Sequence, residues 1–336
     1  MAAGTELEPE IALDLLDRAL AAAWERSGYR DIAELSMHGL DACARLLADG
    51  GDTVWLENPC YPAARNAMLA AGLTPVAVEV DRDGMAPTPG LWQAAPPRLV
   101  YVTPSHQYPL GSVLSLERRL ALLAGVEAGG GWLIEDDYDS DFNHAQPGAR
   151  PLPAIQGLRP EAPVIYVGTF SKLLYPGLRI AYMVVPRWAA SGLGEGIRKL
   201  YRGGQAVEQR ALARLLESGQ LTRHLRRMAP LYRERQAALR GALQAGFGAG
   251  CPVLGGQAGL HLVLGLPASV PDTALAEAAL EQGLAPRPLS AYYVGTTPDN
   301  GLVLGYGLTG VARIPELVKR LAGVAETIPK AGSVSA

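Results

Sequence analysis

The segment GTFSKLLYPGLRI, residues 168–180, follows the apolar run VIYV and places a lysine between a serine and two leucines. Lysine occurs at four positions of the chain, and arginine supplies the other basic side chains. Lys199, Lys319 and Lys330 lie in polar or amphipathic stretches, where a solvated cation is expected. Lys172 instead follows an apolar run, so it calls for a chemical explanation.

Around this segment, short β-rich runs alternate with helical or turn-like stretches. The runs lie at 54–58, 75–80, 99–104, 132–138, 164–170 and 179–185. This alternation predicts an α/β domain with a mostly parallel sheet flanked by helices.

The second part of the chain has a different pattern. Residues 208–243 carry apolar side chains at helical spacing among many arginines, which predicts long helices with a solvated basic face. Strand-like runs at 260–267 and 301–307 then alternate with helix-like runs at 272–283 and 314–328. We expect a smaller α+β domain there.

Composition limits the possible partners of the chain. Its 336 residues carry a net charge of −3, and 19% of them are charged, so direct binding to nucleic acid is not expected. The acidic start MAAGTELEPEIALDLL does not resemble a signal peptide, and no apolar run is long enough to span a bilayer, so we expect a cytoplasmic protein without membrane contact. Three scattered cysteines and five histidines without ligand spacing predict no metal site.

Unusual polar residues follow three of the predicted strands. Ligands of open α/β sheets bind at the carboxyl ends of the strands, so these residues are candidates for one site. WLEN runs into PCYPAAR, WLIE into DDYDSDF, and VIYVG into TFSK. Together these segments supply Tyr61, Asp136, Tyr138, Thr169, Ser171 and Lys172.

This set of residues matches the chemical needs of pyridoxal 5′-phosphate. Its aldehyde needs an amine to form a Schiff base, which Lys172 would supply. Its pyridine nitrogen needs a carboxylate to remain protonated, and Asp136 is the candidate. Tyr138 would hydrogen-bond the phenolate oxygen of the ring, and Tyr61 would stack on the ring face. The phosphate needs hydroxyls and a cation, which Thr169, Ser171 and Arg179 would supply.

Four segments carry a family resemblance. TFSKLLYPGLRIAY, IEDDYDSDF, TPSHQYPLG and ENPCYPAAR resemble segments of class I/II aminotransferases, and most of all the aminotransferase-like domain of MocR/GabR-type regulators. The resemblance covers about residues 40–325 and implies a fold-type I pyridoxal-phosphate-dependent transferase that forms a homodimer. It also implies the roles already given to Lys172, Asp136, Tyr138, Tyr61 and Arg179.

The sequence departs from the family in its N-terminal part. The phosphate-binding motif of the family aligns best with Glu34-Leu35-Ser36-Met37, where Leu35 replaces a glycine and Ser36 remains a candidate phosphate ligand. A small-domain segment is shortened, and no winged-helix stretch precedes the motif. We expect a shortened segment with a helix at 1–35, a large cofactor-binding domain with linking helices at 36–245, a small α+β domain at 246–328 and a flexible tail at 329–336.

The resemblance implies that the chain transfers an amino group from an amino acid to a 2-oxo acid through a Schiff base on Lys172. Arg287 is the candidate for binding the substrate carboxylate, although an exposed arginine on an edge strand is an equal interpretation. Two alternatives remain open. One is a non-catalytic module that binds the cofactor or an effector and derives from a MocR-type regulator. The other is a racemase or decarboxylase that uses the same lysine and acid.

Overall fold

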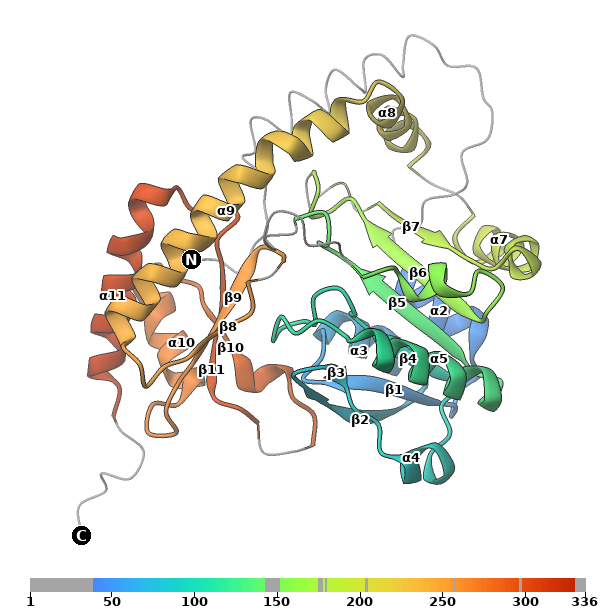
Figure 1. Ribbon diagram of the computed structural model, residues 1–336, viewed down its shortest axis with the longest axis horizontal. Helices are drawn as coiled ribbons and strands as arrows, with labels where there is room; N and C mark the ends of the chain where they lie inside the picture. Colours follow the sequence, from blue (N-terminus) through green and yellow to red (C-terminus); the bar gives the residue numbers. More distant parts are fainter. Residues whose placement is uncertain are drawn as a thin grey trace.

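The computed structural model describes residues 39–142, 152–174, 178, 180–202, 205–256, 258–295 and 298–329. These residues form two sheets that lie beside each other (Figure 1). The larger sheet has seven strands in the order β3-β2-β1-β4-β5-β6-β7, and the smaller has four in the order β10-β11-β9-β8. The carboxyl ends of the large sheet's parallel strands determine where the candidate site lies.

The large sheet is parallel at its centre and antiparallel at both edges. Strands β1 (Thr53–Asn58), β2 (Thr74–Asp81), β4 (Leu99–Val102), β5 (Trp132–Asp137) and β6 (Val164–Thr169) pair in parallel. The edge strands β3 (Gly84–Met85) and β7 (Ala181–Val184) run antiparallel to their neighbours. The prediction of a mostly parallel sheet is confirmed.

Helices cover both faces of this sheet, which explains why its central strands are apolar on both sides. One face packs against α2 (Gly39–Leu47), α3 (Pro62–Ala70) and α7 (Arg187–Tyr201), with Leu47, Met68 and Leu193 in the shared core. The other face packs against α4 (Pro89–Ala94), α5 (Leu116–Gly129) and α6 (Ile155–Leu158), with Leu123 and Ile155 in the core. The result is a three-layer α/β/α domain (Figure 1).

Local sequence signals fix the ends of α5. Its N-cap Ser115 accepts a hydrogen bond from the Arg118 backbone N–H at 3.3 Å, and Gly130 ends the helix with a φ of 68°. A serine at the N-cap and a glycine in the left-handed region are the residues that these positions favour. The helix therefore returns the chain to the start of β5 within a few residues.

Two helices link the sheets, as the helical spacing predicted. The first, α8 (Ala206–Glu217), has Ser218 as its C-cap, and Gly219 with a φ of 68° precedes α9 (Gln220–Phe247). Figure 1 shows α9 as the long helix that runs from α8 to the smaller sheet. Its buried Leu239 and Leu243 pack in one core with residues of that sheet.

The smaller part of the molecule is an antiparallel sheet with helices. It contains β8 (Val253–Leu254), β9 (His261–Gly265), β10 (Arg287–Pro288) and β11 (Gly301–Gly305), with α10 (Asp272–Glu281) and α11 (Ile314–Thr327) packed beside them. The short 3-10 helices η2 (Leu289–Tyr292) and η3 (Val311–Arg313) complete it. The predicted domain boundary at 245 lies within α9, two residues before its end, and the domain division stays a prediction.

No helix among the described residues combines the length and the apolar character that a membrane span requires.

Candidate active site

The carboxyl ends of β1, β4, β5 and β6 meet around a cavity of about 370 Å³. Six of the residues predicted from the strand ends line this cavity: Tyr61, Asp136, Tyr138, Thr169, Ser171 and Lys172. The first residues of α2, from Gly39 to Asp41, also lie on its wall. Segments that are distant in the sequence thus converge at one place, as the parallel topology predicted.

Lys172 lies just after β6 and is partly buried on the cavity wall. Burial lowers its pKa, because desolvation penalises the charged amine, and Arg287 acts in the same direction. The carboxylates of Asp139 and Asp136 act in the opposite direction. Two other lysines lie in the described ranges, and both are exposed: Lys199, which pairs with Glu195, and Lys319.

Asp136 lies near the end of β5 and is only 8% exposed. The Tyr101 hydroxyl donates a hydrogen bond to Oδ2 of Asp136 at 2.7 Å. Burial raises the pKa of Asp136 to about 7, and the negative charges of Asp137 and Asp139 add to this, whereas the Tyr101 hydrogen bond and Lys172 oppose it. A carboxyl group in such surroundings ionises fully when a cationic donor approaches it.

The two predicted tyrosines both contact the ring of Tyr108. Tyr61 is 39% exposed at the start of α3, and its ring meets that of Tyr108 edge to face at 5.5 Å. Tyr138 meets Tyr108 in the same way at 5.7 Å, and its hydroxyl donates to the backbone carbonyl of His106 at 2.8 Å. To donate a hydrogen bond to an oxygen in the cavity, the Tyr138 hydroxyl would therefore have to turn its proton away from the His106 carbonyl.

The predicted phosphate ligands are described only in part. Thr169 and Ser171 line the cavity, and Oγ1 of Thr169 accepts the backbone N–H of Ser171 at 3.1 Å. Arg179 and Ser36 lie outside the described residues. Their roles stay predictions.

Arg287 lies on the edge strand β10 and is exposed. It does not line the cavity, but its charge lowers the pKa of Lys172 and opposes the raised pKa of Tyr108. Arg287 likewise opposes the raised pKa of Tyr292. The position therefore agrees with both interpretations of this residue, an exposed arginine and a cation close to the site.

One buried carboxyl group that was not predicted from the sequence is hydrogen-bonded to Thr103, a residue of the cavity wall. Glu57 is 1% exposed at the end of β1 and accepts hydrogen bonds from the Thr103 hydroxyl at 2.6 Å and the Thr103 backbone N–H at 3.2 Å. Burial raises the pKa of Glu57 to about 7, and these hydrogen bonds oppose the rise. Its position in the segment WLEN, directly before the predicted turn to Tyr61, was the available signal.

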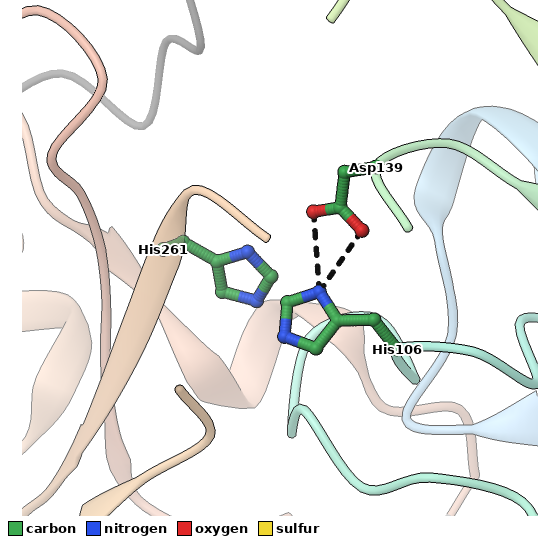
Figure 2. Close-up of side chains that lie close together, drawn as sticks. All are labelled: His106, Asp139 and His261. Carbon is green, nitrogen blue, oxygen red and sulfur yellow. Dashed lines mark hydrogen bonds and ion pairs between the residues drawn. The ribbon is translucent and has the colours of Figure 1, made fainter. Parts of the chain in front are cut away.

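A second missed feature is a cluster of His106, Asp139 and His261, which three separate segments bring together (Figure 2). Nδ1 of His106 lies 3.1 Å from both carboxylate oxygens of Asp139, and the two imidazole rings lie 4.8 Å apart. Histidine spacing in the sequence carries no signal for this cluster. The third residue, Asp139, lies within the quoted segment EDDYDSDF, where only Asp136 and Tyr138 were assigned roles.

The donor set at the cavity fits pyridoxal phosphate. A buried carboxyl whose pKa a neighbouring cation would lower suits a protonated pyridine nitrogen, and a desolvated lysine on the same wall suits an aldehyde. The family model for aminotransferase class I and II matches residues 36–303. The chain belongs to this family. Its members depend on pyridoxal phosphate.

Curated relatives include both regulators and enzymes. The chain is 39% identical over 267 residues to the probable rhizopine catabolism regulatory protein MocR of Rhizobium meliloti, which covers 80% of this chain and 53% of that protein. It is 29% identical over 320 residues to a 2-aminoadipate transaminase of Thermus thermophilus, covering 90% of this chain and 77% of that one. The chain spans about half the length of the regulators that it matches.

Solved structures confirm the predicted fold. The α-aminoadipate aminotransferase LysN of Thermus thermophilus, complexed with N-(5′-phosphopyridoxyl)-L-leucine, gives a TM-score of 0.84 at 25% identity, over 97% of this chain and 91% of that one. A kynurenine aminotransferase of Pyrococcus horikoshii gives 0.78 at 24% identity, over 97% and 82%. The fold is that of the fold-type I aminotransferases, and the predicted family is confirmed.

Proposed function

We propose that the chain binds pyridoxal 5′-phosphate covalently through Lys172 and transfers an amino group from an amino acid to a 2-oxo acid. The observation that carries this proposal is the placement of Lys172 and the buried Asp136 on one cavity wall, with Tyr61 on the same cavity. The family match supports the same cofactor.

The bound cofactor would supply an aldehyde carbon for the amino group and a protonated ring that accepts electrons from the Cα of the substrate. Lys172 would hold the aldehyde in the resting protein, and its Nζ would then take the proton from the substrate Cα and return it. Burial favours this role, because it lowers the pKa of Lys172 and so raises the fraction of neutral amine.

Asp136 would keep the pyridine nitrogen protonated. Its carboxylate lies at the end of β5, and Tyr101 fixes the orientation of Oδ2. Because burial disfavours an uncompensated charge, the anion and the pyridinium would stabilise each other. Tyr61 would cover the ring face from the start of α3.

The remaining residues would hold the ends of the ligands. Thr169 and Ser171 would contact the phosphate together with Arg179 and Ser36, and Tyr138 would contact the ring oxygen. Arg287 would bind the substrate carboxylate, which its electrostatic effect on Lys172 supports. We also propose a homodimer, as in the fold-type I relatives.

A non-catalytic effector-binding module is the second candidate function. The relatives described as transcriptional regulators, of which the chain spans about half, favour this alternative. The same cavity residues would then hold the cofactor or an amine without turnover. A decarboxylase or racemase would likewise use Lys172 and Asp136, so reaction type must be measured.

Visible absorption of the purified protein with added pyridoxal phosphate tests cofactor binding. We expect a protein-bound chromophore that Lys172→Ala removes, whereas Lys199→Ala retains it. A panel of amino acids and 2-oxo acids then tests transfer, with the new amino acid measured by mass spectrometry. A chromophore without any turnover would favour the effector-binding module, and the absence of a chromophore would contradict covalent binding of the cofactor through Lys172.

A further inference from the structure

Asp139 and His106 form a buried pair next to the candidate site. Asp139 is 2% exposed and His106 is 1% exposed, and both come from loops that follow strands of the large sheet. Figure 2 shows the Asp139 carboxylate directed at Nδ1 of His106, with the His261 ring from β9 beside them. Nδ1 of His106 also lies 3.0 Å from the Tyr138 hydroxyl oxygen.

Hydrogen bonding assigns the protons of both imidazoles. Nε2 of His261 lies 2.9 Å from the carbonyl oxygen of Pro109 and must donate to it. Nε2 of His106 is buried and has no hydrogen-bond partner within the described part of the chain, whereas oxygens of Asp139 and Tyr138 surround its Nδ1. The proton of His106 therefore belongs on Nδ1, because an unpaired buried acceptor costs less than an unpaired buried N–H.

This arrangement differs from a metal site. The candidate ligand atoms of the three residues spread over up to 4.8 Å. Atoms that share one tetrahedral zinc at about 2.1 Å lie about 3.4 Å apart. His106 already donates from Nδ1 to the carboxylate, so the cluster is a hydrogen-bonded pair with a second imidazole packed on it.

Gly259 fixes the pair from the side of the small sheet. Its φ is +78°, and a Cβ there would overlap both Oδ2 of Asp139 and Nδ1 of His106. The backbone N–H of Gly259 donates to the Phe142 carbonyl at 3.0 Å, just after the Asp139 turn. The carboxylate is therefore held between two parts of the chain and cannot turn toward solvent.

We propose that Asp139, held by His106, is a positioning residue of the candidate site. Its buried carboxylate follows Tyr138, which shares one cavity with Lys172, and through His106 it keeps the Tyr138 hydroxyl in place. This inference rests on the proposed function in one respect, the role of Lys172 as the reactive amine. The charge of Asp139 raises the pKa of Lys172 against the lowering effect of burial. Asp139 would thus favour the ammonium form of Lys172, whereas burial favours the neutral amine.

Other charged and titratable groups surround this pair and enter its pH dependence. They come from β5, β6, β9, β10, β11 and the adjoining loops: His261, Tyr138, Tyr306, Lys172, Asp136, Asp141 and Arg287. Burial lowers the pKa of His261 to about 3, so that ring stays neutral at ordinary pH. Tyr138 and Tyr306 also remain neutral there, because burial raises their pKa.

The pH dependence of Lys172 reactivity in the cofactor-free protein tests the proposal. Reductive methylation with formaldehyde and dimethylamine–borane reports the neutral amine, and peptide mass spectrometry gives the rate for Lys172 alone. In Asp139→Asn, we expect the pH midpoint of Lys172 methylation to fall. The methylation rate of Lys172 below that midpoint should rise roughly three- to tenfold, since one pKa unit changes the neutral fraction of the amine about tenfold. Asp137→Asn is the matched control, because its side chain accepts from Ser140 and Tyr166 instead.

An unchanged Lys172 midpoint in Asp139→Asn would overturn the proposal, as would an equal shift in Asp137→Asn. If Asp139→Asn does not fold, Asp139→Ala removes the charge with a smaller side chain beside Gly259, and the same shift is expected. The measurement needs no pyridoxal phosphate. A protein that never binds the cofactor would therefore contradict the proposed function and still answer whether Asp139 controls Lys172.

Discussion

Asp136 and Asp137 are neighbours along β5 whose side chains point to opposite faces of the sheet. Asp136 lines the cavity and accepts from Tyr101, whereas Asp137 accepts from the hydroxyls of Ser140 at 2.6 Å and Tyr166 at 2.9 Å. The first carboxylate is therefore available to a ligand, and the second is committed to protein groups. This difference favours Asp136 over Asp137 as the proposed functional acid.

Replacing Asp136 by asparagine should keep the fold and slow proton removal from the substrate by at least about a hundredfold, because each unit of lost pKa matching costs about 1.4 kcal/mol. Stopped-flow absorbance with an amino donor would measure this. Asp137→Asn should change the rate much less. If Asp137→Asn were the more damaging change, the assignment along EDDY would be wrong by one residue.

Glu57 should make the cofactor-free protein less stable as the pH rises. Its pKa is raised in the folded protein, to about 7, so the folded state binds a proton that the unfolded state has released above pH 4.5. The free energy of unfolding should fall between pH 4.5 and 7 by roughly 3 kcal/mol from this group, at about 1.4 kcal/mol per pKa unit. Asp136 should contribute in the same direction.

Urea unfolding of the cofactor-free protein at several pH values would measure this slope. Glu57→Gln should flatten it, because glutamine does not titrate. Glu79→Gln, an exposed position that pairs with Asn58 on the neighbouring strand, is the matched control. An equal slope in wild type and Glu57→Gln would contradict the assignment of this pH dependence to Glu57.

Residues that line the cavity could be predicted where one short segment contains both the strand and the side chain that follows it. Lys172 and Asp136 are such cases, because the carboxyl end of a buried strand can be recognised locally. His106, Asp139 and His261 are the opposite case, since packing between the two sheets brings them together. Their contact depends on Gly259, whose requirement for a positive φ the sequence does not reveal.

At the scale of elements, the turn before β9 should be sensitive to any side chain at residue 259. Gly259→Ala would push Cβ against His106 and Asp139 and would strain a backbone at φ +78°. We expect a loss of roughly 2–4 kcal/mol in the free energy of unfolding, from overpacking and left-handed strain together. Gly283 has a φ of +72°, and a Cβ added there would meet no atom within 4 Å. Gly283→Ala should therefore lower the free energy of unfolding only through backbone strain, by about 1 kcal/mol.

Denaturant unfolding of the two glycine variants would measure both losses. Equal losses at the two positions would contradict the tight packing of the Asp139–His106 pair.

The short strands β3, β8 and β10 were not predicted, because each has two residues and two residues carry no periodicity. The long strands and helices were predicted because their apolar patterns extend over enough residues.

At the scale of the whole molecule, the sequence predicts that the chain holds pyridoxal phosphate more weakly than a relative with a glycine at position 35, which lies outside the described residues. Leu35 stands where a glycine would let backbone amides close on the phosphate, and charge-assisted hydrogen bonds contribute about 1.5–3 kcal/mol each. Leu35→Gly should therefore tighten cofactor binding by about tenfold or more. Leu35→Ala should gain much less, since alanine lacks the backbone freedom of glycine.

Titration of the cofactor-free protein with pyridoxal phosphate, followed by fluorescence and light scattering, would measure affinity and mass together. We expect a dimer whose fraction increases with bound cofactor, because a ligand that binds the assembled form stabilises it. A monomer that binds the cofactor tightly would contradict the homodimer, and equal affinities of wild type and Leu35→Gly would contradict the role of Leu35.

The central claim is that Lys172 is the amine that holds the cofactor. Borohydride reduction of the protein loaded with pyridoxal phosphate, followed by peptide mass mapping, tests it most directly. The account predicts a pyridoxyl label on Lys172 that Lys172→Ala abolishes and that Lys199→Ala or Lys319→Ala leaves in place. A label on any other lysine, or no label on a protein shown to bind the cofactor, would contradict it.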